Sequence, residues 1–218
     1  DPHIDKIALD FLADFKPEIR VAGGDWQTVD QVSKFVTESK VHLKKEFKMN
    51  REALRQFGIT HYLEGNHEQR LRRIGALDER LRSLADLATN LKLKKLGIPL
   101  IPYHPRKGVL TFGHLKVLHG FFTTEYVAKK TAAIYGTCVF GHVHRFQTFQ
   151  SKEAYETHCG FGIGLMGKID QPYTDDRAPM GWTNGFCFGY IHKNGWFDMY
   201  TVRIFNNRVI INDVLYRG

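Results

Sequence analysis

Two short motifs constrain this chain more than any other feature, because each follows directly on an apolar run. Gly65–Glu68 reads Gly-Asn-His-Glu and comes after the run Ile59–Leu63. Gly141–His144 reads Gly-His-Val-His and comes after Cys138–Phe140. Short apolar runs that end at glycine are typical of buried strands. The polar residues are therefore expected in loops at strand ends, where a rigid sheet can present several loops to one point.

Three further fragments add metal-binding side chains to these motifs. They are Asp1-Pro2-His3, Gly24-Asp25 and His119-Gly120. The five fragments together supply two Asp, one Asn and five His. Carboxylate and amide oxygens combined with neutral imidazoles suit manganese, iron or zinc. Two such ions side by side assist in-line attack at phosphorus, so the inventory points to phosphate-ester chemistry.

The order of apolar and polar runs predicts one layered α/β domain over residues 1–218, with residues 146–218 mostly β. We see no internal repeat or low-complexity linker. The expected helices cover residues 7–15, 30–57, 68–90 and 123–135. The expected strands cover residues 19–22, 59–63, 98–103, 108–112, 115–118, 138–140, 146–150, 156–159, 186–192, 196–205 and 208–214. Turns are expected at residues 193–195 and 206–207.

Composition narrows the class of protein and its partners. The 218 residues are 43% hydrophobic and 25% charged, as in soluble globular proteins. No apolar stretch reaches the roughly 18 residues that a bilayer span needs, so no membrane partner is expected. Three scattered cysteines fit a reducing cytoplasm rather than a disulfide framework. The net charge of +8 favours polyanionic partners such as nucleic acid.

The five fragments, in this order, resemble the motifs of the calcineurin-like metallophosphoesterase superfamily, and the layout is most similar to its phage and prophage branch. The resemblance covers Asp1–His144 directly. It implies a four-layer α-β-β-α sandwich with two mixed β-sheets and a metal site at the carboxyl ends of the strands. The trailing β segment would belong to the second sheet. In a viral protein the compartment would be the host cytoplasm.

The resemblance also implies a pair of divalent ions, with Mn²⁺ preferred and Fe, Zn, Ni or Co as alternatives. A hydroxide bridging the two ions would attack phosphorus. One residue, Asp25, would bridge both ions. The remaining ligands would be Asp1, His3 and His144 for the first ion and Asn66, His119 and His142 for the second.

His67 matches a family histidine that does not bind metal but stabilises the transition state or protonates the leaving oxygen. The family often carries a second Asp that orients this histidine, and Thr28 stands at that position here. Asp30 and Glu68 are alternative partners for His67. A second departure is the start of the chain, since an apolar strand is expected before Asp1 and none is present in this sequence.

Basic side chains near the motifs are candidate substrate contacts. Arg70 and Arg73 share one face of the expected helix, and Arg145 follows His144 directly. All three could hold a backbone phosphate, and a solvated basic face is the alternative interpretation. The lysines of the long helix are interpreted as solvated or as a remote electrostatic footprint; they are Lys40, Lys44, Lys45 and Lys48.

Three functions remain open on this sequence. The preferred one is a metal-dependent phosphodiesterase or nuclease acting on nucleic acid or nucleotide phosphate esters. A phosphomonoesterase, acting on nucleotides or phosphoproteins, would use the same metals and residues. A catalytically silent interaction module on the same fold is the alternative from another class. Such modules typically lose metal ligands or the catalytic histidine, and all of these positions are filled here.

Overall fold

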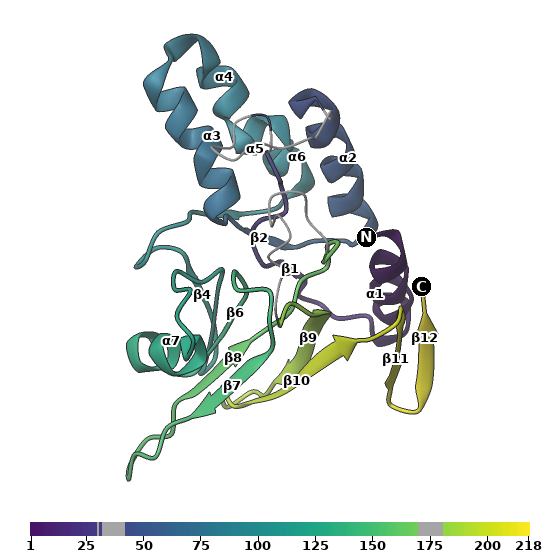
Figure 1. Ribbon diagram of the computed structural model, residues 1–218, viewed down its shortest axis with the longest axis vertical. Coiled ribbons are helices and arrows are strands. Elements are labelled where there is room, and N and C mark those ends of the chain that lie inside the picture. Colours follow the sequence, from purple (N-terminus) through teal and green to yellow (C-terminus); the bar gives the residue numbers. More distant parts are fainter. Residues whose placement is uncertain (30, 32–41, 170–180) are drawn as a thin grey trace. The chain divides into compact units, whose positions relative to one another are not determined.

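The computed structural model describes residues 1–29, 31, 42–169 and 181–218 (Figure 1). Its helices and strands confirm the predicted mixed α/β class. The chain divides into two compact units. Unit 1 comprises Asp1–Lys16 together with Val109–Gly218, and unit 2 comprises Pro17–Gly108. The single domain over residues 1–218 stays a prediction.

Unit 2 is built on a short parallel sheet in the order β1-β2-β3. The strands are β1 (Val21–Ala22), β2 (His61–Leu63) and β3 (Leu100–Ile101), and each pairs in parallel with its neighbour. The register sets Ala22 beside Tyr62, so the loops after β1 and β2 leave the sheet at the same edge. The helices of this unit are α2 (Leu43–Gln56), α3 (Asn66–Leu77), α4 (Arg82–Ala85), α5 (Leu87–Asn90) and α6 (Leu93–Leu96), with a 3-10 turn η2 (Glu79–Leu81).

The core of unit 2 forms because each of its longer helices has one apolar face. Residues spaced three or four apart along α2 place Leu43, Phe47 and Leu54 on one buried side. These pack with Tyr62 of β2 and Leu71 of α3 in one hydrophobic cluster. The burial anchors the helices against the sheet and fixes where the loops after β1 and β2 emerge.

Unit 1 contains a five-stranded mixed sheet in the order β4-β5-β6-β8-β7. Its three inner strands, β5, β6 and β8, run in parallel, and the outer strands pair antiparallel. The elements are β4 (Val109–Phe112), β5 (Leu115–Leu118), β6 (Cys138–Phe140), β7 (Gln147–Gln150) and β8 (Cys159–Gly162), with helix α7 (Val127–Tyr135) packing on the sheet through the buried residues Val127, Ala128, Cys138 and Phe140.

Two hairpins and helix α1 complete unit 1 (Figure 1). The hairpins are β9 (Asn184–Ile191) with β10 (Phe197–Ile204), and β11 (Arg208–Ile211) with β12 (Val214–Arg217). Helix α1 (Pro2–Phe15) packs its apolar face against them, with Phe11 contacting Phe186 and Tyr216 at ring distances of 5.2 and 5.8 Å. The last third is therefore β-rich, as predicted.

Several predicted bounds are wrong for local physical reasons. The helix expected from residue 30 begins in the described chain at Leu43, because His42 has an extended backbone; residues 30 and 32–41 lie outside the described residues. The helix expected over 68–90 is divided at Asp78, which is extended and whose carboxylate caps the next turn at Arg80. Helix 7–15 begins earlier, at Pro2, because Asp1 caps it.

The strand predicted over 208–214 is also wrong, because it is two strands joined by a tight turn. Asn212 and Asp213 have φ of 49° and 63°, the left-handed conformation that a two-residue hairpin turn requires. The strand expected at 156–159 lies instead at Cys159–Gly162. No helix within the described ranges has the length and apolar character needed to cross a membrane.

Candidate metal centre

Unit 2 brings Asp25 and His67 together at the carboxyl ends of β1 and β2. Asp25 Oδ1 accepts a hydrogen bond from the backbone N–H of His67 at 2.9 Å. Its Oδ2 lies 3.8 Å from His67 Nε2. Both side chains are largely buried, at 10% and 13% exposed. Because β1 and β2 are parallel neighbours, the sheet itself places these two loops side by side.

Glu68 is the polar centre of this arrangement. Its side chain is buried, with 1% of its surface exposed. It accepts hydrogen bonds from the backbone N–H groups of Asp25, Gln27 and Gly65 at 2.9–3.1 Å. It also accepts one from the Tyr62 hydroxyl at 2.8 Å. One carboxylate therefore ties the loop after β1 to the loop after β2 and to the strand between them.

The burial of this network shifts its pKa values. Burial, followed by the nearby Asp25 carboxylate, raises the pKa of Glu68 to about 7. Hydrogen bonds from Gln27 and Tyr62 act in the opposite direction. Burial also raises the pKa of Tyr62 well above its ordinary value, so that hydroxyl stays a donor.

The close approach of Asp25 explains why the Gly-Asn-His-Glu motif begins with glycine, at Gly65. A Cβ atom at this position would overlap the carboxylate and backbone nitrogen of Asp25. Its N–H is the helix N-cap donor that Glu68 accepts, as in a capping box. The glycine thus permits the close approach of the two loops, and Asn66 follows it as the first residue of α3.

Unit 1 brings His119 and His142 together by the same device of parallel neighbouring strands. The register pairs Leu118 of β5 with Phe140 of β6, so the residues after each strand are adjacent. Gly141 N–H donates to His119 O at 2.9 Å, and the two imidazole ring centres lie 5.1 Å apart. His119 is buried, with 2% of its surface exposed.

Gly120 is required by this close packing. Its φ of 111° lies in a region that side-chain-bearing residues rarely adopt. A Cβ placed there would also approach the Cβ of His142 to 3.1 Å. The His-Gly fragment is therefore a histidine at a strand end followed by the glycine that lets a second histidine come near.

His144 is held by a different part of unit 1. Its carbonyl accepts a hydrogen bond from Thr183 N–H at 2.9 Å. Its ring meets that of Trp182 edge to face, with centres 4.4 Å apart. The segment before β9 thus fixes the end of the Gly-His-Val-His loop.

Three of the predicted ligands share an uncommon backbone conformation. Asp25, His142 and His144 have φ of 53°, 66° and 57°. Non-glycine residues with positive φ are uncommon, cost free energy and gather at functional sites. The chain thus maintains this strain at residues whose side chains suit a metal.

Asp25 in unit 2 and His119 and His142 in unit 1 are side chains of the kinds that could hold a metal ion. Their carboxylate oxygen and imidazole nitrogens are chemically suited to a divalent transition metal. Among the described residues, neither His144 nor the Asp1 and His3 pair is included with these three.

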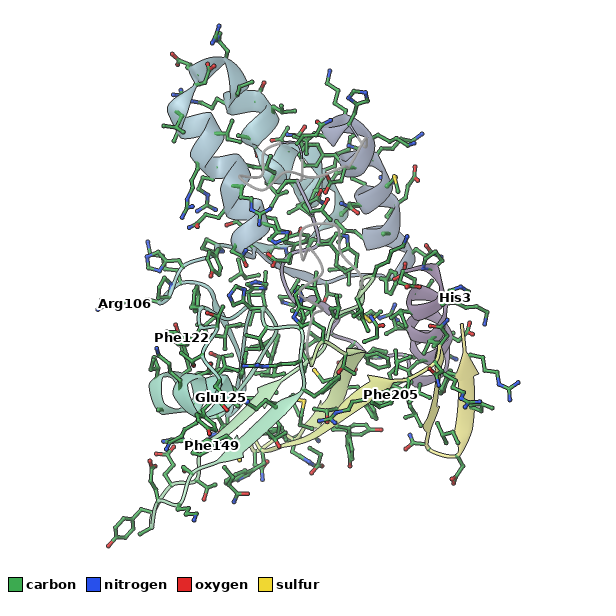
Figure 2. The ribbon with its side chains drawn as sticks, viewed as in Figure 1. His3, Arg106, Phe122, Glu125, Phe149 and Phe205 are labelled. Carbon is green, nitrogen blue, oxygen red and sulfur yellow. The ribbon has the colours of Figure 1, made fainter. Side chains whose placement is uncertain are left out.

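Asp1 and His3 lie at the amino end of α1. Asp1 Oδ1 accepts from the His3 backbone N–H at 3.0 Å and so caps the helix. His3 is exposed on α1 (Figure 2). Their roles as ligands of the first ion stay a prediction.

The arginines predicted to contact substrate have protein partners. Arg145 Nη2 donates to the carbonyls of Thr124 and Glu125 at 2.8 and 3.1 Å. Arg73 donates to Gln69 at 3.0 Å, and Arg70 approaches Thr28 O at 3.5 Å. A substrate contact by any of them stays a prediction.

Thr28 stands at the position where an Asp that orients His67 would be expected, and it bonds to a different residue. Thr28 bonds through its N–H and its hydroxyl to Glu46 of α2, at 2.7 and 3.2 Å. Asp30 lies outside the described residues. The described bonds of Glu68 go to backbone N–H groups and Tyr62, and its pairing with His67 stays a prediction.

Sequence reasoning did not identify Glu68 and Tyr62 as the scaffold of this site. The signal that could have identified Glu68 is its position in the first turn of a helix that follows a buried strand. A charged side chain is tolerated in such a buried place only when it has several hydrogen-bond partners. Trp26, which follows Asp25, packs edge to face on Phe57 with ring centres 5.8 Å apart.

No protein-family model matches this chain, and no curated protein matches it significantly.

Proposed function

We propose that this protein is a binuclear metal-dependent phosphoesterase of the calcineurin-like type that hydrolyses phosphodiesters in nucleic acid or nucleotides. The observation that carries the proposal is the chemistry and strand-end placement of Asp25 in unit 2 and of His119 and His142 in unit 1. All three follow strands directly or within three residues, and two of them have the positive φ typical of functional positions. The finer fold of this proposal is the four-layer α-β-β-α sandwich with two mixed sheets.

In this proposal two sets of residues hold two divalent ions, with Mn²⁺ as the first choice. When bound, the ions supply Lewis acidity toward the phosphate oxygens. The donor chemistry fits such ions, because it combines hard oxygens with imidazole nitrogens and contains no thiolate. Asp25 joins the two sets; the others are Asp1, His3 and His144 in one and Asn66, His119 and His142 in the other.

The chain's own residues perform the remaining work. His67 donates a proton to the leaving oxygen or stabilises its developing charge. Its position is set by Asp25, which accepts from its backbone N–H and lies 3.8 Å from its Nε2. Glu68 in turn fixes Asp25 through the backbone, so one buried carboxylate holds both functional side chains of unit 2 in register.

A phosphomonoesterase is the alternative within the same chemistry. The decisive experiment is hydrolysis of bis-p-nitrophenyl phosphate against p-nitrophenyl phosphate with Mn²⁺, alongside single-stranded DNA and RNA. Cleavage of the diester and of a polymer is expected. Turnover of the monoester alone would replace the proposal by a phosphatase, and two bound metals without any turnover would favour the silent interaction module.

A further inference from the structure

The positive charge of this chain is concentrated in unit 2. Pro17–Gly108 holds 18 Lys and Arg against 11 Asp and Glu, a net +7. The rest of the chain holds 13 against 12. Such an imbalance within one compact unit is the electrostatic footprint of a polyanion-binding surface.

Much of the charge on the α3–α4 side of unit 2 is neutralised locally. Arg72 pairs with Glu64, Arg80 with Asp78 at 2.8 Å, and Arg82 with Glu79 at 3.1 Å. The arginine of each pair is exposed, and among the acidic partners Glu64 is buried. These pairs leave little net field, so this side is not the source of the imbalance.

Helix α2 carries a stripe of positive charge without acidic partners. The cationic stripe consists of Lys44, Lys48, Arg51 and Arg55, whose spacing of four, three and four residues aligns them along one side of the helix. Among the described residues none of the four forms an ion pair. Glu52 lies beside the stripe and is exposed, but is not paired with it.

An ordinary solvated helix face pairs opposite charges one turn apart. Helix α1 shows the usual solution, with Lys6 paired to Asp10 one turn later at 2.7 Å. Like charges one turn apart are mutually destabilising, whereas opposite charges stabilise a helix. The stripe on α2 therefore works against the stability of its own helix, and a bound anion would remove that repulsion.

A second basic cluster continues the stripe within unit 2. Arg51 Nη1 donates to Asn90 O at 2.7 Å and so joins α2 to the end of α5, next to α6 (Figure 1). Directly after Asn90 come the lysines of a surface hollow of about 640 Å³. The hollow is lined by Asp86, Ala88, Thr89, Lys92, Lys94 and Lys95.

The one carboxylate lining this hollow is engaged in capping. Asp86 accepts from the Thr89 N–H at 3.0 Å and from its hydroxyl at 2.7 Å, which caps α5. The Thr89 bonds lower the pKa of Asp86. Lys92, Lys94 and Lys95 are exposed and, among the described residues, unpaired.

We propose that the cationic stripe of α2 and the adjoining Lys92–Lys95 cluster bind the phosphate backbone of a nucleic acid. The stripe is about 16 Å long, or about five phosphate spacings of one strand. Lysine and arginine at this spacing contact phosphates without reading sequence. The inference names the polymeric substrate of the proposed function and in that sense rests on it, but binding is measurable without hydrolysis.

The test is fluorescence anisotropy of the full chain with labelled 30-residue single-stranded DNA, duplex DNA and RNA, in EDTA and at several salt concentrations. The variant is Lys44→Gln, Lys48→Gln and Arg55→Gln combined; Arg51 is left intact because it bonds Asn90. The matched control is Lys129→Gln, Lys152→Gln and Lys193→Gln, three exposed lysines of unit 1 with the same charge loss.

We expect the stripe variant to bind roughly 10- to 100-fold more weakly at low salt, with the slope of log Kd against log salt reduced by about 2–3. The control should bind within about twofold of the natural chain. Equal weakening by both triple variants, or an unchanged slope, would overturn the proposal. Binding to vesicles containing phosphatidylserine without binding to nucleic acid would also overturn it, in favour of a membrane surface.

Hydrolysis of the small diester separates this inference from the proposed function. The stripe variant should cleave bis-p-nitrophenyl phosphate as the natural chain does, because no stripe residue belongs to the candidate metal centre. If the natural chain cleaves no ester yet binds polymer through the stripe, the proposed function fails and the binding surface stands. If it cleaves the small ester but binds no polymer in EDTA, the binding surface fails alone.

Discussion

The two units hold their candidate metal ligands by different physical means. In unit 2 a buried carboxylate, Glu68, accepts hydrogen bonds from three backbone N–H groups and a tyrosine, and these bonds fix Asp25 and His67. In unit 1 parallel strand register and a glycine contact set the positions of His119 and His142. Losing one group should therefore disturb many contacts in unit 2 but few in unit 1.

This difference separates stability from function. A polar network concentrates several hydrogen bonds on one residue, so a single substitution leaves several buried groups unsatisfied. Where strand register and backbone contacts set the position of a side chain, many residues share the energetic cost. Removing that one side chain should therefore lower the stability of the fold only slightly. Substitutions in each unit can test the contrast.

Asp25→Asn should have the largest effect, and it should fall on metal rather than on fold. The amide oxygen can still accept from the His67 N–H, so the loop of unit 2 keeps its anchor. The lost charge weakens the proposed bridging ligand, and we expect metal affinity to fall about 100-fold or more, with activity lost. Metal analysis beside urea denaturation checks this. Two metals retained per chain would show that Asp25 is not the bridge.

His67→Ala should lower turnover by roughly 10²–10⁴-fold, the usual contribution of a positioned proton donor. Metal content should stay intact, because His67 is not among the proposed ligands. The measurement is steady-state hydrolysis of the small diester with metal analysis of the same samples. Unchanged turnover would remove His67 from the mechanism, and lost metal would make it a ligand.

Glu68→Ala should destabilise the protein by at least about 3–4 kcal/mol, because it leaves three buried donors and one partly buried donor without their acceptor, and each costs about 1 kcal/mol or more. Urea denaturation measures the change. Glu68→Gln is the control, since the amide keeps one accepting oxygen and should cost less. Equal stability of the alanine variant and the natural chain would mean that the network does not hold unit 2 together.

The sequence predicted the candidate metal ligands better than it predicted the residues that hold them in place. Apolar runs ending in glycine located β2 and β6 well, because short buried strands leave a clear pattern. It could not assign Glu68, since a charged residue early in a helix usually faces solvent and its burial depends on the partners that tertiary structure provides. The Asn212–Asp213 turn was missed because apolar residues flank it directly on both sides.

Positive φ at ligand positions was likewise beyond sequence reasoning. Asp25, His142 and His144 adopt it because neighbouring contacts impose it, while their side chains alone favour other conformations. The structural roles of the glycines could be predicted from the sequence only in part. Gly120 marks a turn in the sequence, but its closeness to His142 depends on strand register.

Gly120→Ala should destabilise unit 1 by about 2–3 kcal/mol and displace His142. Its φ of 111° is strained for alanine, and the added Cβ would lie 3.1 Å from that of His142. Gly97→Ala in unit 2 is the control, because Gly97 has φ of 70° with nothing within 4 Å and should cost about 1 kcal/mol. Similar costs for both variants would show that the contact with His142 is unimportant.

The smallest effect concerns pH and unit 1 alone, because all three cysteines lie there. Burial raises the pKa of the Cys138 thiol from 9.0 to about 12. The unfolded chain therefore loses this proton first as pH rises, so the contribution of Cys138 to stability is complete below pH 9 and is lost between about pH 9 and 12. The slope contributed by this single thiol is at most about 1.4 kcal/mol per pH unit. Urea midpoints at pH 8 and 10, compared with Cys138→Ala, measure it. A variant with the same pH dependence as the natural chain would show that Cys138 titrates alike folded and unfolded, and that burial in the β6 core does not protect it.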